Sequence, residues 1–188
     1  MIVGDKNVFA IETYISKAYN RSSFLALGYF VVYILGARYG VYKSDATMLG
    51  CSFDEVEQRV KARGAHVAKF TEHLSAGIIA DGFRIAIYCS EPHEVDQTTL
   101  DVIELFKKDN RFVWAPDGDA AFDDGSYILH FDCGDQVRLI AFRCNSNGLH
   151  DPATMMQLWI PEDKFYSVLE TWLCDFHAQW VGLEKEKS

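Results

Sequence analysis

The strongest constraint on the fold is an apolar stripe near the C-terminal end of the chain. Pro161 suits the first turn of a helix there. The acidic side chains of Glu162 and Asp163 would stabilise the positive N-terminal end of its dipole. Gly182 provides a natural end to the same helix. A long aromatic stripe must be covered by other parts of the protein, so the sequence predicts an amphipathic helix packed against a sheet. Its apolar side chains recur at helical spacing and are Phe165, Val168, Leu169, Trp172, Leu173, Phe176 and Trp180.

Strands are expected on both sides of a helical middle segment. Residues 7–16 nearly alternate between the two faces of a strand, and residues 27–35 are β-branched and aromatic throughout, which is typical of a strand buried on both faces. Gly36 can turn the chain into a third strand at 39–42. Beyond the middle segment, Gly134–Asp135 marks a hairpin turn. The strands expected there are 112–115, 127–131, 137–143 and 155–160.

Three helices are expected in the middle segment. Ser52 and Glu55 form a capping box, which predicts a helix from Ser52 that ends at Gly64. Further helices are predicted at 76–88, capped by Ser75 and weakened by Gly82, and at 96–108. This order of elements predicts an α+β fold, in which antiparallel sheets from the two halves pack with helices. Since 188 residues without a linker suit one domain, we expect residues 1–188 to form a single domain.

The charge of the chain is concentrated in one segment. Residues 91–135 contain twelve acidic and three basic side chains, so this segment alone accounts for the formal net charge of −9. The negative electrostatic field of this segment repels nucleic-acid phosphates and anionic membranes, and it attracts basic partners. Direct binding to nucleic acid or to a membrane is therefore not expected. A solvated acidic face that keeps the protein soluble is the alternative explanation.

No motif predicts a catalytic site, a metal or another cofactor. Loop 117–125 is rich in aspartate, but Ala121 and Phe122 stand where a calcium-binding EF-hand needs an oxygen ligand and a glycine. A looser carboxylate cage for Mg²⁺ or Ca²⁺ remains an alternative. His130 and Asp132 share one face of a strand. They could act as an acid–base pair, or, more simply, they are a polar pair on a solvated face. The chain is therefore not expected to be an enzyme.

The five cysteines indicate a reducing compartment. Their number is odd, no pair is spaced C-x-x-C, and no secretory segment precedes them, so free thiols in the cytoplasm are expected. Cys133 and Cys144 could meet across the hairpin as thiols. The longest apolar stretch, residues 24–37, is too short to cross a bilayer and predicts a buried strand instead.

Several runs together resemble immunity protein family 42, a family associated with bacterial polymorphic toxin systems and contact-dependent inhibition. The most specific of them are Ala-Phe-Asp-Asp-Gly-Ser-Tyr at 121–127 and Val-Arg-Leu-Ile-Ala-Phe at 137–142. The resemblance implies a small cytoplasmic protein without enzymatic activity, which binds the C-terminal domain of a cognate toxin and blocks it. It supplies no catalytic residue and no toxin-binding residue for this chain. The other runs are 9–12, 28–34 with 39–41, 52–57 with 63–66, and the aromatic positions 165, 166, 172 and 176.

The charge pattern suggests where a partner would bind. An acidic surface can occupy the basic cleft of a nuclease toxin as a mimic of phosphate, and turn formation with solubility is the alternative. Exposed aromatic side chains at Trp114, Phe122 or Tyr127 would add binding energy, unless they belong to the core. Rival functions are a small metal-dependent hydrolase that uses loop 117–124, and an adaptor or subunit of a larger assembly. The predicted partner contacts are Asp117, Asp119, Asp123 and Asp124, with Asp132 and Asp135.

Overall fold

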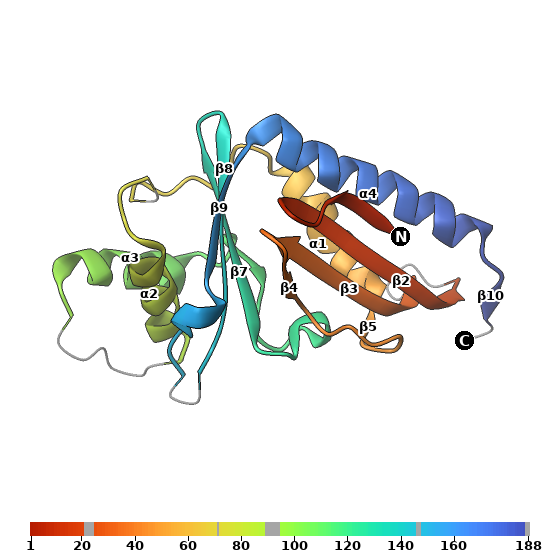
Figure 1. Ribbon diagram of the computed structural model, residues 1–188, viewed down its shortest axis with the longest axis horizontal. Helices are drawn as coiled ribbons and strands as arrows, with labels where there is room; N and C mark the ends of the chain where they lie inside the picture. The colour runs from red at the N-terminus through yellow and green to blue at the C-terminus, as the bar shows by residue number, and fades with distance from the viewer. Residues whose placement is uncertain (21–24, 71, 89–94, 146–147, 187–188) are drawn as a thin grey trace.

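A computed structural model describes residues 1–20, 25–70, 72–88, 95–145 and 148–186, and it contains two sheets and four α-helices (Figure 1). The N-terminal sheet has the order β1-β2-β3-β4, with β5 added to β3 and β10 added in parallel to β2. The C-terminal sheet has the antiparallel order β6-β7-β8-β9. This arrangement is the α+β class that the sequence predicts. The strands of the N-terminal sheet are β1 (Ile2–Asp5), β2 (Phe9–Tyr19), β3 (Ala26–Ile34), β4 (Ala37–Tyr39), β5 (Thr47–Met48) and β10 (Lys185–Glu186).

The helices cover both sheets. Figure 1 shows α4 (Glu162–Gly182) lying along the N-terminal sheet, while α2 (Ala76–Tyr88) and α3 (Gln97–Lys108) lie on the opposite side of the C-terminal sheet. Helix α1 (Leu49–Lys61) packs against α4 and β3. The C-terminal sheet is therefore covered on both faces. Its strands are β6 (Val113–Ala115), β7 (Ser126–Cys133), β8 (Gln136–Arg143) and β9 (Met156–Pro161).

Alternate residues of β7 and β8 enter two separate hydrophobic clusters. Ile128 and Leu139 join the cluster that contains α4 and the N-terminal sheet. Leu129 and Ile140 face the other way and join the cluster under α2 and α3. Because successive side chains of a strand point to opposite faces, one hairpin supplies both clusters. Trp114, Phe122 and Tyr127 are also buried, at 1%, 4% and 3% exposure, so they belong to the core and not to a binding surface.

The C-terminal helix confirms the prediction from its apolar stripe. Phe165, Leu169, Trp172 and Phe176 are at most 1% exposed. Burying each such side chain contributes about 1.5–3 kcal/mol relative to leaving it in water. Trp172 Nε1 also donates a hydrogen bond of 2.8 Å to Oγ1 of Thr13 on β2, which fixes the helix against the N-terminal sheet.

The predicted start of the first helix is wrong, whereas the two following starts are confirmed. Helix α1 begins at Leu49, has no side-chain cap, and encloses Ser52, whose buried hydroxyl has no partner in the described part of the chain. Leu49 is fully buried, so packing of this residue decides where the helix begins. The caps of α2 and α3 are present: Ser75 accepts from the Ile78 amide, and Asp96 accepts from the Thr99 amide at 2.7 Å.

No helix within the described ranges is both long enough and apolar enough to cross a membrane.

Candidate partner-binding site

The aspartate-rich loop joins β6 to β7 and keeps part of its charge unneutralised. Asp117 and Asp123 are exposed, and Asp119 is partly buried. Asp119 caps the short 3₁₀ turn Ala120–Phe122 by accepting from the Ala121 amide at 2.9 Å. Burial raises the pKa of Asp119, the Ala121 amide opposes this rise, and the charge of Asp123 adds to it. Within the part of the chain that the structure describes, none of these three carboxylates forms an ion pair. They leave negative charge on the surface.

Asp124 differs from its neighbours because its charge is neutralised. Its Oδ2 lies 3.0 Å from Nη2 of Arg143, and the same oxygen accepts from the Gly40 amide at 3.2 Å. These two contacts tie the loop to β8 and to the end of β4. Asp124 therefore holds the loop in place and is not available to a basic partner in this arrangement.

The prediction that all six aspartates form one acidic surface is wrong. Asp132 is only 3% exposed, because its face of β7 is the one that α1 and α4 cover. Asp135 is exposed but lies in the turn between β7 and β8. Figure 1 shows this turn at the opposite end of the hairpin from the aspartate-rich loop. Eight residues of β7 separate the two ends, which corresponds to roughly 25 Å of strand. Glu91 and Glu94, which were counted in the acidic segment, lie outside the described residues.

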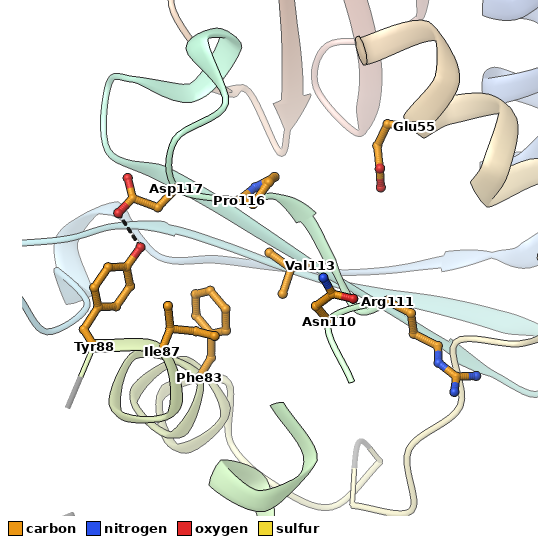
Figure 2. A pocket seen from close by; sticks show the side chains of 9 residues that line it. All are labelled: Glu55, Phe83, Ile87, Tyr88, Asn110, Arg111, Val113, Pro116 and Asp117. Carbon is orange, nitrogen blue, oxygen red and sulfur yellow. Dashed lines mark hydrogen bonds between the residues drawn. The ribbon is translucent and has the colours of Figure 1, made fainter. Parts of the chain in front are cut away.

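A hollow of about 330 Å³ lies beside the loop and combines apolar walls with carboxylates (Figure 2). Glu55 comes from α1 on one side, and Asp117 comes from the loop on the other. Ile87 and Tyr88, at the end of α2, are 47% and 43% exposed. The remaining lining residues are Phe83, Asn110, Arg111, Val113 and Pro116. A second, shallower hollow shares Asp117 and continues toward Asp119.

A chain of hydrogen bonds holds Asp117 at the rim of this hollow. The Tyr88 hydroxyl donates to Asp117 and lies 3.1 Å from the Tyr127 hydroxyl. Arg84 donates to the Tyr127 hydroxyl at 2.6 Å, and its guanidinium stacks 3.7 Å from the centre of the Tyr88 ring. Burial raises the pKa of Tyr88, and the bond to Asp117 adds to this effect. The rim carboxylate is therefore preorganised by the core.

Sequence reasoning missed Glu55 and Tyr88 as parts of this site. Glu55 was assigned to a helix cap, and Tyr88 was seen only as the last residue of a helix. Their proximity depends on how α1, α2 and the loop pack. The single available signal is the spacing of Ile79, Phe83 and Ile87, which continues the apolar stripe of α2 to its exposed end.

Asp132 is the centre of a buried polar cluster. Its Oδ2 accepts from the backbone amide of His66 at 2.9 Å and lies 3.1 Å from that residue's Nδ1. Its Oδ1 accepts from the Tyr166 hydroxyl at 2.9 Å and lies 3.2 Å from Nε2 of His130. Burial raises the pKa of Asp132, but the bonds to His130 and His66 outweigh burial and hold it below its usual range. The predicted polar pair on a solvated face is therefore wrong, since every member is buried.

The hydrogen bonds of this cluster do not suit a metal ion. Nitrogen and oxygen atoms of His66, His130 and Asp132 lie within 4.8 Å of one another, as in a metal site. However, Nη1 of Arg59 lies 2.9 Å from Nδ1 of His130, so this nitrogen must accept and Nε2 must carry the proton. A protonated Nε2 donates to Asp132 and cannot ligate a metal. In the described ranges no other group of three ligands converges, the aspartate-rich loop included.

The cysteines do not form the pair that the sequence allowed. Cys133 lies beside the β7–β8 turn. Cys144 follows β8 at the other end of the hairpin, where its backbone forms an isolated antiparallel β-bridge with His150. Cys51, Cys144 and Cys174 carry free thiols. Cys89 lies outside the described residues.

Comparison with known proteins gives one family and one solved structure. The family model described as Immunity protein 42 matches residues 1–174. No curated protein matches the chain. The crystal structure of CdiI from Burkholderia dolosa AUO158 is similar in fold, with a TM-score of 0.61 at 17% sequence identity, over 93% of this chain and 99% of that chain.

Proposed function

The chain belongs to the immunity protein 42 family, and from this premise we propose that it neutralises a cognate toxin domain by binding it. Neutralisation by binding requires no catalytic step from the immunity protein. It acts in the cytoplasm of the cell that must be protected. The buried cluster around Asp132 stabilises the fold and takes no part in a reaction.

The toxin-binding surface is the rim formed by Asp117, Asp119 and Asp123 together with the adjoining hollow. The observation that supports this choice is the combination of unpaired carboxylates with two exposed apolar side chains, Ile87 and Tyr88. Stable interfaces depend on a few aromatic or apolar anchors, which are surrounded by polar groups. Charged groups at the rim mainly accelerate the encounter and select the partner.

The partner that fits this surface is a toxin domain with a basic patch. A nuclease, whose cleft binds phosphate, has such a patch close to its active site. An acidic loop placed there would block substrate and would be attracted from a distance, with a rate that salt reduces.

The test compares two variants that carry the same change in net charge. In the loop variant, Asp117, Asp119 and Asp123 are all changed to Asn. In the control variant, the exposed residues Asp135, Glu170 and Asp175 are changed to Asn, Gln and Asn. Association rates with the toxin domain encoded beside this chain are measured at low and high salt, together with rescue of cells that express the toxin.

We expect the loop variant to associate at least tenfold more slowly at low salt, and the control variant to retain the wild-type rate. Equal rates for the two variants would refute the acidic loop as the docking surface. Failure of the unaltered protein to bind the toxin and to protect cells would refute toxin neutralisation itself.

A further inference from the structure

We propose that the hollow between Glu55 and Asp117 receives an arginine side chain of the toxin. This inference rests on the proposed function and names the group that the site would bind. The hollow is open to solvent. Glu55 lines it from α1 and Asp117 lines it from the loop, and Figure 2 shows the Asp117 carboxylate turned toward the Tyr88 hydroxyl at the rim.

Each carboxylate uses one oxygen in a hydrogen bond within the protein. Oε1 of Glu55 accepts from Arg59 at 2.9 Å, and Oδ2 of Asp117 accepts from Tyr88. These bonds fix the two side chains in place. For Oε2 of Glu55 and Oδ1 of Asp117, the described ranges of the chain provide no hydrogen-bond donor. A guanidinium has five N–H donors and can pair with one such oxygen, while the second carboxylate adds attraction at longer range.

The cations already near the hollow do not fill this role. Arg111 lines the hollow, but Figure 2 shows its guanidinium directed away from Asp117. That group pairs with Asp109 and donates to the Ala65 carbonyl at 3.2 Å. Arg59 and Arg84 lie behind the wall, at 2% and 8% exposure. The charge that an incoming side chain meets first is therefore negative.

The remaining lining favours arginine over lysine. Phe83, Ile87, Val113 and Pro116 offer apolar surface to the methylene groups of a long side chain. Tyr88 is 43% exposed. One face of its ring already stacks on the Arg84 guanidinium, so an incoming planar cation would meet the other face. A guanidinium is less strongly hydrated than an ammonium group, so it loses less hydration free energy when it enters a partly apolar hollow. It also stacks on aromatic faces.

A small-molecule titration tests this inference without the toxin. The probes are N-acetyl-arginine amide and N-acetyl-citrulline amide, its neutral isostere, and the signals are the methyl resonances of Ile87 and Val113. We expect saturable shifts with the arginine probe and at least fivefold weaker binding of the citrulline probe. The double variant Glu55→Gln, Asp117→Asn should abolish the difference, because both amides keep the acceptors for Arg59 and Tyr88 but lose the charge. Equal responses to the two probes, or no saturable shift with the arginine probe, would overturn the inference.

The toxin complex gives a second readout that separates this inference from the proposed function. The double variant should bind the toxin domain about tenfold more weakly than the wild type. Because Glu55→Gln also weakens the ion pair with the buried Arg59, binding is measured well below the thermal unfolding midpoint of the variant. Unchanged affinity of the double variant, with tight binding by the wild type, would overturn the arginine site and leave toxin neutralisation intact.

Discussion

Nη1 of Arg59 lies 2.9 Å from Nδ1 of His130, and both side chains are buried between α1 and β7. Since an arginine can only donate, this contact places the histidine proton on Nε2, where it is donated to Asp132. Protonation of Nδ1 would set a second cation against the guanidinium. Burial, together with the charges of Arg59 and His66, lowers the pKa of His130 to about 3, and the bond to Asp132 only partly opposes them.

The first prediction concerns stability in acid. His130 takes up a proton near pH 6.5 when unfolded but only near pH 3 when folded. Between these values the unfolded state binds the extra proton, so the free energy of unfolding falls by up to about 1.4 kcal/mol per pH unit as pH decreases. His130→Gln keeps an acceptor for Arg59 and a donor for Asp132. Urea unfolding from pH 7 to 4.5 should show a shallower decline for this variant than for the wild type. Parallel curves would contradict the prediction.

The second prediction concerns the centre of the same cluster. Asp132→Ala removes the acceptor of four hydrogen bonds and leaves buried donors on His66, His130 and Tyr166 without a partner. The loss of free energy of unfolding should be about 3–5 kcal/mol, as when one member of a buried charged pair is removed. The matched control is Asp135→Asn in the turn of the same hairpin, which is exposed and should change stability by less than about 0.5 kcal/mol. Chemical denaturation of both variants provides the measurement.

The contrast between these two aspartates shows what the sequence could specify and what it could not. Alternation along β7 correctly put His130 and Asp132 on one face of a strand. Whether that face meets water depends on α1 and α4, which approach it from distant parts of the chain. Local patterns do not contain this information, so the charge of Asp132 was wrongly assigned to the surface.

Local patterns predicted helices and strands, but they could not predict the hollow, because it depends on contacts between distant segments. The cap at Ser75 and the apolar stripe of α4 depend on residues a few positions apart, and both are confirmed. Glu55, Tyr88 and Asp117 come from three segments that meet only after folding. The helix start predicted from the capping box at Ser52 was also wrong, because the burial of Leu49 makes α1 begin one turn earlier.

The third prediction concerns two glycines on α2. A Cβ on Gly82 would lie 2.5 Å from Cγ1 of Val102 on α3, whereas a Cβ on Gly77 would meet nothing nearer than His150 at 3.6 Å. Gly82→Ala gains helix propensity but forces the two helices apart, so it should destabilise the protein by about 1–3 kcal/mol. Gly77→Ala should stabilise it by about 0.5–1 kcal/mol. Thermal unfolding distinguishes these outcomes, and a Gly82→Ala variant as stable as the wild type would show that α2 and α3 are not in close contact.

The last prediction separates binding from stability at two adjacent loop residues. Asp123 is exposed and forms no ion pair with the residues that the structure describes, so Asp123→Asn should slow toxin association at low salt and leave unfolding unchanged. Asp124 pairs with Arg143 and accepts from the Gly40 amide, so Asp124→Asn should lower the free energy of unfolding by about 0.5–2 kcal/mol. Because this second carboxylate is already neutralised, its loss should change the association rate less than the loss of Asp123. Stopped-flow association and urea unfolding on the same two samples measure both quantities. Equal rate effects would mean that the ion pair with Arg143 opens before the toxin arrives.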